Sequence, residues 1–328
     1  MPNHQQELDA AIAAVRAAAR VCRDVQQDLV TAQTLEKKDK SPVTVADFAS
    51  QAIVCTLLTQ ALPGARVVGE EDSKELREPG QTSIRASVVE HAARVLGSAG
   101  EDDVLHAIDL GGADASGERY WTLDPIDGTK GFLRGEQYAI ALGLIENGEV
   151  VAGALGCPNL PLGSATGALF AAARGQGARV LPLWSQGSGE AIRVAAVRQP
   201  SEGRFCESVE SGHSNQDEAA QIAARLGITS KPFRIDSQCK YAAVARGDAS
   251  IYLRMPTRKD YREKIWDHAA GKIVVEEAGG RVSDVSGKPL DFTKGSTLED
   301  NRGVVATSGA IHDQVIEAVR AVRGASAD

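Results

Sequence analysis

The chain has 328 residues, which is long for one small domain and suggests two lobes or one large α/β unit. Apolar residues make up 43% of it, charged residues 24%, and the formal net charge is −8. We therefore expect a globular protein without a basic surface for a nucleic-acid polymer, although a few placed cations or metal ions would still bind a small polyanion.

The cysteines and the first residues of the chain bear on its compartment. Five cysteines form no Cys-x-x-Cys pair and are odd in number, so we expect reduced, mostly buried thiols. The start of the chain has no charged stretch followed by an apolar core, and no apolar run approaches the roughly 20 residues of a membrane helix. These features favour a cytoplasmic protein without a secretory signal or a membrane partner.

The first quarter of the chain predicts two long helices and a short strand. Apolar residues recur at near-helical spacing over residues 5–32, and a second helix is expected over residues 45–62, ahead of a Pro-Gly pair. This second helix would carry Asp47 in its first turn. A short strand at residues 66–69 would end at Glu70.

Residues 73–117 are the least informative stretch. They are rich in Gly, Asp and Glu, and only residues 87–96 show an amphipathic helical pattern. The stretch could be a mobile cover over a site or an ordinary surface insertion, and the composition slightly favours the insertion.

The middle of the chain predicts antiparallel strands. Two apolar runs within residues 138–155 flank Asn147-Gly148, which is a strong hairpin signal. A second hairpin is expected over residues 168–181, around a Gly-Gln-Gly turn. These strands would be backed by the two long helices.

A short run of small polar residues, 185–189, predicts a boundary between two lobes. We expect an N-terminal α+β lobe of residues 1–185, with an antiparallel sheet and most metal ligands, and a C-terminal α/β lobe of residues 186–328. Strand and helix patterns alternate in the second lobe, with strands at 192–197, 205–209, 250–253 and 304–306, and helices at 216–226, 241–245, 265–278 and 310–322.

One run, Trp121–Phe132, is the most informative part of the chain. Asp124 and Asp127 sit three residues apart after a short strand-like stretch, and Pro125 restricts the backbone so that it must turn at the strand end. Such a turn can aim both carboxylates and the Ile126 carbonyl at one point. Hard divalent cations, Mg²⁺ in particular, prefer such oxygens.

Gly128 and Thr129 begin the next segment, whose free backbone N–H groups could hold a phosphate. An isolated Asp-x-x-Asp with these dipeptides is more often an ordinary turn. The complete sequence Asp-Pro-Ile-Asp-Gly-Thr, with aromatic and glycine neighbours, favours a metal and phosphate site.

The same run resembles the signature of the inositol monophosphatase superfamily, a group of Mg²⁺-dependent, lithium-sensitive phosphatases. Further stretches resemble the other signatures of that superfamily in the same order: Ser41–Asp47, Val67–Glu71, Ile265–Gly271 and Glu276–Gly280. The resemblance implies a layered αβαβα sandwich with two lobes, within the α/β (α+β) class, and the element pattern above is compatible with it.

Two stretches in the second half resemble one branch of this superfamily, the 3′(2′),5′-bisphosphate nucleotidases. They are Asp236–Tyr241 and Tyr252–Arg254. The resemblance implies removal of the 3′ or 2′ phosphate from adenosine 3′,5′-bisphosphate, giving AMP and phosphate. It also implies action on 3′-phosphoadenylyl sulfate and a place in sulfur assimilation.

Phosphate monoester hydrolysis requires charge neutralisation and an in-line water, which two metal ions about 4 Å apart can supply. Four carboxylates and one carbonyl are predicted to hold two or three Mg²⁺ ions: Glu70, Asp124, Ile126, Asp127 and Asp267. Glu70 lies in an acidic run that could be simply solvated, and Asp267 could stabilise a helix dipole.

Asp47, together with the Thr129 hydroxyl, is the candidate that activates the attacking water. A lone Asp or Thr at a helix start is more often a cap. The match of Ser41–Asp47 to the superfamily favours the catalytic role for Asp47, and the resemblance implies that Thr129 links Asp47 to the metal-bound water.

A bisphosphorylated nucleoside presents its second phosphate away from the metal ions, so a second cationic group is needed. Lys240 and Arg254 could bind it, the arginine as a two-pronged fork. The resemblance completes the predicted substrate-binding set, which is Gly128, Thr129, His213, Ser237, Lys240, Arg254 and Asp267.

Two other functions stay open. An inositol monophosphatase or inositol polyphosphate 1-phosphatase would use the same metal site, and a non-catalytic phosphonucleotide sensor would share the fold. The sensor is disfavoured because every metal carboxylate and Asp47 are present. The oligomeric state is left open by the sequence.

Overall fold

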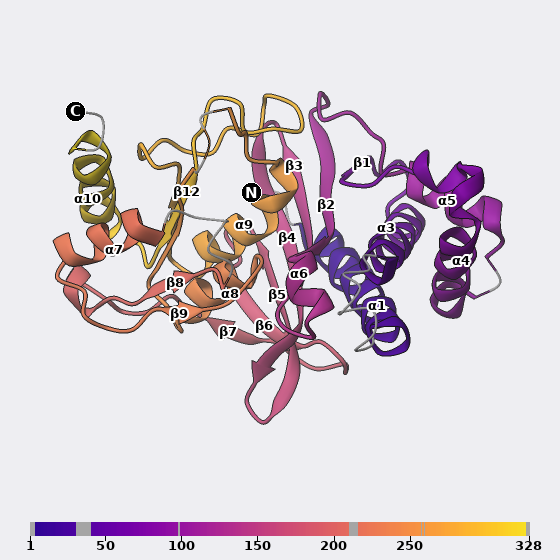
Figure 1. Cartoon of the computed structure of the whole chain (residues 1–328), viewed down its shortest axis with the longest axis horizontal. Coiled ribbons are helices and arrows are strands. Elements are labelled where there is room, and N and C mark those ends of the chain that lie inside the picture. Colours follow the sequence, from indigo (N-terminus) through magenta and orange to yellow (C-terminus); the bar gives the residue numbers. More distant parts are fainter. Residues whose placement is uncertain are drawn as a thin grey trace.

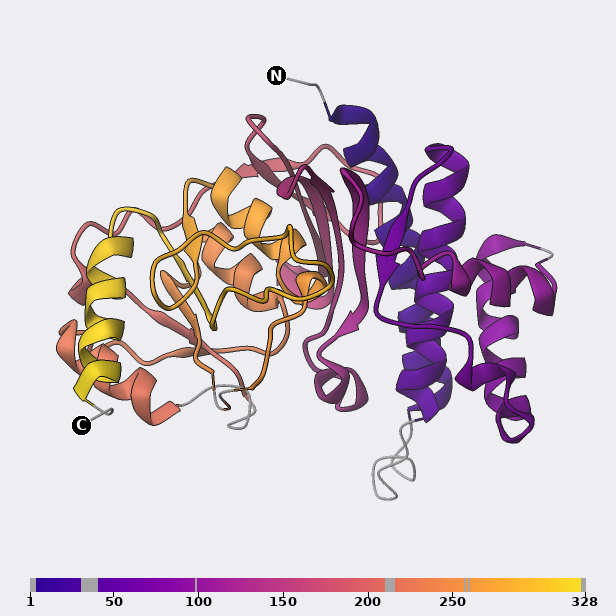
Figure 2. The ribbon, with the colours of Figure 1, turned by 90° about the horizontal axis from the view of Figure 1, so that it is seen from above.

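The protein is described here by a computed structural model that covers residues 4–30, 41–97, 99–209, 216–256, 258 and 260–325. Helices and sheets alternate in five layers, α, β, α, β and α, which are seen edge-on in Figure 2. The expected layered sandwich is therefore confirmed.

The first two layers are a helical layer and a seven-stranded sheet (Figure 1). The helices α1 (Gln5–Leu29) and α3 (Ser41–Ala61) cover one face of the sheet. The strands follow in chain order: β1 (Val67–Gly69), β2 (Arg119–Asp127), β3 (Ala139–Glu146), β4 (Glu149–Leu162), β5 (Ala165–Ala173), β6 (Ala178–Pro182) and β7 (Glu190–Ile192). All neighbours pair antiparallel except β1 and β2, which are parallel.

The other three layers are a central helical layer, a five-stranded mixed sheet and an outer helical layer. The central layer is α8 (Cys239–Arg246) and α9 (Ala269–Glu277). The sheet has the order β11 (Arg281–Ser283), β12 (Val304–Thr307), β10 (Ile251–Arg254), β8 (Phe205–Glu207) and β9 (Phe233–Arg234). The outer helices are α7 (Gln216–Arg225) and α10 (His312–Ala325). Three apolar clusters fill the spaces between the layers.

The long helix α3 differs from its prediction in two ways. It already includes Ser41, so Asp47 lies beyond the first turn; Pro42 is tolerated there because a first-turn residue needs no helical N–H partner. The expectation that no apolar run could span a membrane is also wrong for this helix, which is long and apolar enough. Its most apolar window is 78% buried inside the protein, which is typical of a core helix.

Residues 73–117 form a surface addition, as the composition slightly favoured. The helix expected at 87–96 begins earlier, as α4 (Thr82–Leu96), and a further helix, α5 (Glu101–Asp109), was not predicted. Both pack against α3 on the side away from the sheet (Figure 1). The stretch also contains the short 3-10 helices η1 (Glu75–Arg77) and η2 (Pro79–Gln81).

Both predicted hairpins are confirmed, and β4 and β5 form a third one between them. The strand expected at 192–197 is wrong: β7 ends at Ile192 and pairs with β6 in the first sheet. The chain then leaves the sheet, and the Val194 N–H donates to the Ala278 carbonyl at the end of α9. The division into lobes at residue 186 stays a prediction.

In the second half, the strands expected near 205, 250 and 304 are confirmed, as are the helices near 216, 241 and 310. The helix expected over 265–278 is interrupted. A 3-10 helix, η5 (Ile265–Asp267), is separated from α9 by His268, whose φ of −135° is not helical. The strands β9 and β11 and the 3-10 helix η3 (Pro200–Glu202) were not predicted.

Candidate active site

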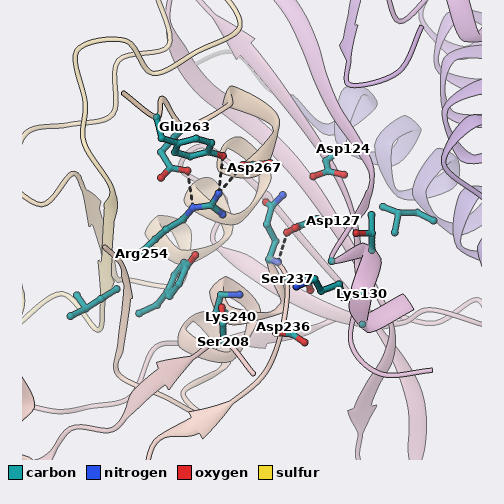
Figure 3. A pocket seen from close by; sticks show the side chains of 18 of the residues that line it. Asp124, Asp127, Lys130, Ser208, Asp236, Ser237, Lys240, Arg254, Glu263 and Asp267 are labelled. Atoms are coloured by element: carbon teal, nitrogen blue, oxygen red, sulfur yellow. Dashed lines mark hydrogen bonds and ion pairs between the residues drawn. The ribbon is translucent and has the colours of Figure 1, made fainter. Parts of the chain in front are cut away.

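A pocket of about 540 Å³ opens between elements of the two sheets. The end of β2 and the start of α6 (Thr129–Leu133) form one side, and residues of β10, α8 and η5 form the other. Figure 3 shows Asp124 and Asp127 on the first side and Lys240 and Arg254 across from them. Ten of the predicted residues line this pocket: Glu70, Asp124, Ile126, Asp127, Gly128, Thr129, Ser237, Lys240, Arg254 and Asp267.

A bulge in β2 positions the two aspartates. β2 pairs with β3 up to Asp124 and again at Asp127, with a register shift between the two residues. A bulge bends a strand and re-aims its side chains, and it tolerates Pro125, which cannot donate to the ladder. The Ser50 hydroxyl of α3 donates to the Pro125 carbonyl at 3.1 Å. The predicted strand end at Asp124 is therefore wrong, because β2 continues through the bulge.

Two left-handed residues meet beside the aspartates. Gly128 has φ of 94° and Ser237 has φ of 63°. A Cβ on Gly128 would lie 2.8 Å from the Ser237 Cβ, so the close approach requires glycine on the α6 side. This contact connects the segment after β2 to the segment before α8.

A backbone hydrogen bond connects the same two segments. The Gln238 N–H donates to Asp127 Oδ2 at 2.5 Å. The Gln238 side chain donates to the Trp266 carbonyl at 2.9 Å and accepts from the Gly271 N–H at 3.3 Å. Gln238, just before α8, therefore connects the end of β2, η5 and α9 around the pocket, a role that the sequence did not suggest.

The acidic groups of the pocket raise one another's pKa values. Burial, followed by Asp267, Glu71 and Asp127, raises the pKa of Glu70 to about 8. The pKa of Asp124 is raised well above its usual value by burial and then by Glu70 and Asp127. Like charges in a desolvated site disfavour ionisation, so this cluster requires compensating positive charge.

The site contains a feature that fits a metal ion. Asp124 is 2% exposed, and within the described parts of the chain its Oδ1 has no hydrogen-bond partner. An ionised carboxylate without a partner is costly to bury, whereas a cation would satisfy it. The oxygen-only set of Glu70, Asp124, Asp127, Asp267 and the Ile126 carbonyl fits a hard divalent cation.

Asp47 and Thr129 occupy different positions relative to the pocket. Thr129, the first residue of α6, is part of the lining. Asp47 is buried in α3 and is not among the described residues that line the pocket. Burial and then Glu71 and Glu70 raise the pKa of Asp47 well above its usual value, which places it close to the proposed metal ligands.

Arg254, at the end of β10, is shared between acidic partners. Its Nε donates to Glu263 Oε2 at 2.7 Å, and its Nη2 lies 3.2 Å from both Asp267 Oδ2 and the Tyr261 hydroxyl. Burial would lower the pKa of Arg254, but Glu263 and Asp267 raise it well above its usual value. The guanidinium therefore stays charged beside a predicted metal ligand.

Lys240, in the first turn of α8, provides the second cation. It is 5% exposed, and its Nζ lies 5.4 Å from the ring centroid of Tyr252. Burial lowers the pKa of Lys240, whereas Asp127 acts to raise it. Figure 3 shows its side chain near Ser208, on the same side of the pocket as Arg254.

Two acidic residues of the pocket lining, Asp236 and Glu263, were not predicted as site residues. Glu263, Asp267 and His268 have potential ligand atoms within 4.8 Å of one another, although the Glu263 carboxylate is already paired with Arg254. Asp236 accepts from Arg134 at 2.7 Å. Arg134 and Asp236 are 102 residues apart, so no spacing pattern in the sequence could identify their contact, whereas Glu263 lies only four residues before Asp267.

The predicted nucleotide residue His213 lies outside the residues that the structure describes. Its placement in the site stays a prediction.

The sequence of the chain is similar to those of known proteins. The family model described as "Inositol monophosphatase family" matches residues 3–323 of the chain. The chain is 47% identical to the 3′(2′),5′-bisphosphate nucleotidase of Oryza sativa, over 96% of this chain and 93% of that protein. It is also 47% identical to the 3′(2′),5′-bisphosphate nucleotidase of Schizosaccharomyces pombe, over 96% and 95%.

Solved structures with the same fold have much lower identity. An inositol monophosphatase from Anabaena (Nostoc) sp. PCC 7120 aligns over 100% of both chains with a TM-score of 0.66 and 22% identity. A Thermotoga maritima inositol monophosphatase covers 97% of this chain and 98% of its own, with a TM-score of 0.63 and 22% identity. These two likenesses concern the fold alone.

Proposed function

Because the chain belongs to the inositol monophosphatase family and is 47% identical to 3′(2′),5′-bisphosphate nucleotidases, we propose that it hydrolyses the same class of substrate. It removes the 3′ or 2′ phosphate from adenosine 3′,5′-bisphosphate and releases AMP and phosphate. The single observation that carries this substrate choice is the pair of cations, Lys240 and Arg254, in one pocket with the four carboxylates.

The acidic side of the pocket is the proposed metal site. Glu70, Asp124, Asp127, Asp267 and the Ile126 carbonyl would hold two or three Mg²⁺ ions, which supply positive charge against the phosphate oxygens and acidify an attacking water. The partnerless Oδ1 of Asp124 and the mutual repulsion of the carboxylates support this assignment.

Asp47 and Thr129 are the proposed groups that act on the attacking water. Asp47 would accept its proton, and the Thr129 hydroxyl would orient it. The water oxygen then bonds to phosphorus as the bond to the ribose oxygen breaks. The leaving ribose oxygen takes a proton from solvent, and Asp47 releases its proton to solvent. Burial and then the charges of Glu71 and Glu70 raise the pKa of Asp47. Asp47 therefore lies close to Glu70, a proposed metal ligand, and this supports the role.

The cationic side of the pocket is the proposed site of the phosphate that is not cleaved. Lys240 and Arg254 would bind it, because desolvated cations form strong charge-assisted hydrogen bonds with phosphate oxygens. Backbone N–H groups at Gly128 and Thr129 would hold the reacting phosphate, and Ser237 and His213 would complete the nucleotide site. The same set would accept 3′-phosphoadenylyl sulfate, since the phosphate removed is the same.

The substrate assignment is tested by comparing two substrates on the wild-type enzyme with Mg²⁺. We expect a higher kcat/KM for adenosine 3′,5′-bisphosphate than for inositol 1-phosphate, with AMP as the nucleotide product. A preference for inositol 1-phosphate would favour an inositol monophosphatase instead. Tight nucleotide binding without phosphate release would favour a sensor.

We also propose a setting for this activity. The five cysteines are all free and buried, which suits a reducing compartment such as the cytoplasm. The net charge of −8 disfavours a nucleic-acid polymer as partner, and the burial of α3 disfavours a membrane. The reaction would clear a bisphosphate by-product of sulfur assimilation.

A further inference from the structure

Arg254 lies between the proposed metal site and the proposed second-phosphate site. The proposed role of Arg254 is to bind the uncleaved phosphate. Its Nη2, however, lies 3.2 Å from Asp267 Oδ2, and Asp267 is also a proposed metal ligand. An arginine and an aspartate that paired fully would neutralise each other and weaken both sites. Some other group must therefore hold the guanidinium.

Glu263 is placed to hold it. The Arg254 Nε to Glu263 Oε2 distance is 2.7 Å, which is shorter than the 3.2 Å contact to Asp267. The Glu263 side chain is 4% exposed, whereas that of Asp267 is 17% exposed. Charge-assisted contacts strengthen in a desolvated setting, so Glu263 is the stronger anchor. Figure 3 shows both contacts fanning out from the one guanidinium.

Glu263 is itself held by buried residues behind the pocket. His268 Nε2 lies 3.1 Å from Glu263 Oε2, and His268 Nδ1 lies 2.8 Å from the Tyr241 hydroxyl. Tyr241 lies on α8, and a Cβ on Gly271 of α9 would come within 2.2 Å of its ring. This chain of contacts gives the carboxylate little freedom to move.

We propose that Glu263 is a positioning residue that prevents Arg254 from collapsing onto Asp267, so that metal and the second phosphate are bound at the same time. This inference rests on the proposed function, because it assigns the metal to Asp267 and the uncleaved phosphate to Arg254. Glu263 contacts neither in this scheme and acts only through Arg254.

The test is a double-mutant cycle of Glu263→Gln and Arg254→Met, read by Mn²⁺ binding to the substrate-free protein in electron paramagnetic resonance titrations. Glutamine keeps the shape and removes the charge, so Arg254 shifts to Asp267. We expect the Mn²⁺ Kd to rise on the order of tenfold, the scale of one charge-assisted contact. In the Arg254→Met background the same substitution should change the Kd by about twofold or less.

Direct charge loss is the competing explanation, because Glu263 lies close to Asp267. It predicts an equal rise in Kd in both backgrounds, and that result would overturn the proposal, as would an unchanged Kd in Glu263→Gln. If the single variant does not fold, Tyr261→Phe and His268→Gln are compared instead. Loss of the neutral Tyr261 contact should leave the Kd unchanged, whereas loss of the His268 contact should raise it.

A kinetic readout separates positioning from general damage. At saturating Mg²⁺, Glu263→Gln should raise KM for adenosine 3′,5′-bisphosphate and leave kcat within about twofold, with inositol 1-phosphate kinetics unchanged. Glu299→Gln is the control for loss of a glutamate charge, since it removes the charge of an exposed glutamate that pairs with Arg262 outside the pocket lining. If the wild type proves inactive on the bisphosphate, the proposed function fails, and the Mn²⁺ cycle still reports on Glu263 by itself.

Discussion

Asp124 is the residue at which burial and charge conflict most clearly. It is 2% exposed, its Oδ1 has no partner among the described residues, and Glu70 and Asp127 repel its charge. Such a group destabilises the metal-free protein, and a cation bound in the proposed metal site would compensate its charge.

Asp124→Asn should abolish turnover and stabilise the metal-free fold. The amide removes one negative charge from the cluster, so metal affinity falls and repulsion is relieved. Both effects are measurable, as kcat at saturating Mg²⁺ and as Tm in a chelator. Asp127→Asn should behave in the same way, and a variant that kept more than a few per cent of wild-type kcat would contradict the metal assignment.

Asp47→Asn should lower kcat by about 10²- to 10⁴-fold, the usual contribution of a general base. Substrate and metal binding should be nearly unchanged, because Asp47 is neither a proposed metal ligand nor among the described residues that line the pocket. Steady-state kinetics with Mg²⁺ separate the two quantities. Normal kcat with a raised KM would assign Asp47 a structural role.

Arg254→Met and Lys240→Met should each lower kcat/KM for adenosine 3′,5′-bisphosphate by roughly 10- to 100-fold, as expected for a lost charge-assisted contact. A monophosphate such as inositol 1-phosphate has no second phosphate to contact these cations, so its kcat/KM should change little. Lys272→Met is the matched control, because Lys272 is equally buried on α9 but pairs with Glu276 outside the pocket lining. Equal losses on both substrates would remove the second-phosphate site.

Among the elements, the turn from β2 into α6 has the strictest conformational demand. The bulge at Pro125 turns both aspartates into the pocket, and Gly128 then follows at φ of 94° against Ser237. The geometry of the pocket therefore depends on a contact between two segments more than 100 residues apart in the chain.

Gly128→Ala should destabilise the protein by about 1–3 kcal/mol, the cost of a strained left-handed residue. It should also lower kcat, because the new Cβ displaces Ser237 and the Asp127–Gln238 hydrogen bond beside it. Chemical denaturation and kinetics measure the two effects. Gly135→Ala is the control, since Gly135 has φ of 70° but open space around its Cβ. It should lose stability without the same loss of kcat.

At the scale of the whole molecule, the acidic cluster predicts how stability depends on pH. The pKa of Glu70 rises from 4.5 to about 8 in the folded state, so the folded protein binds more protons than the unfolded chain between these values. Stability must therefore fall as pH rises through that window. Burial and like charges raise the pKa of Asp124 and of Asp127 in the same direction.

In a chelator, Tm should decrease from pH 5.5 to pH 8. Excess Mg²⁺ should remove or reverse this slope, because a metal that binds only the folded, deprotonated site adds stability at high pH. Thermal melts at several pH values with and without Mg²⁺ measure both curves. A Tm that rose with pH in the chelator would contradict the assignment of the buried acidic cluster.

The sequence by itself determined the features whose cause is local. The periodicity of residues 5–32 predicted α1, Asn147-Gly148 predicted the β3–β4 hairpin, and the Asp-Pro-Ile-Asp-Gly-Thr run predicted which residues line the acidic side of the pocket. Each of these signals is contained within one segment, so neighbours along the chain suffice to read it.

Only the tertiary structure decided the features that depend on distant segments. The apolar helix α3 is a core helix because it packs between the first sheet and α4. The strand β7 belongs to the first sheet because it pairs with β6. The contacts of Arg254 with Glu263 and Asp267 arise because β10 and η5 meet at the pocket. The contacts of a side chain with another layer leave no periodic signal in the sequence. They depend on how the layers pack and on which buried charges need a partner of opposite sign.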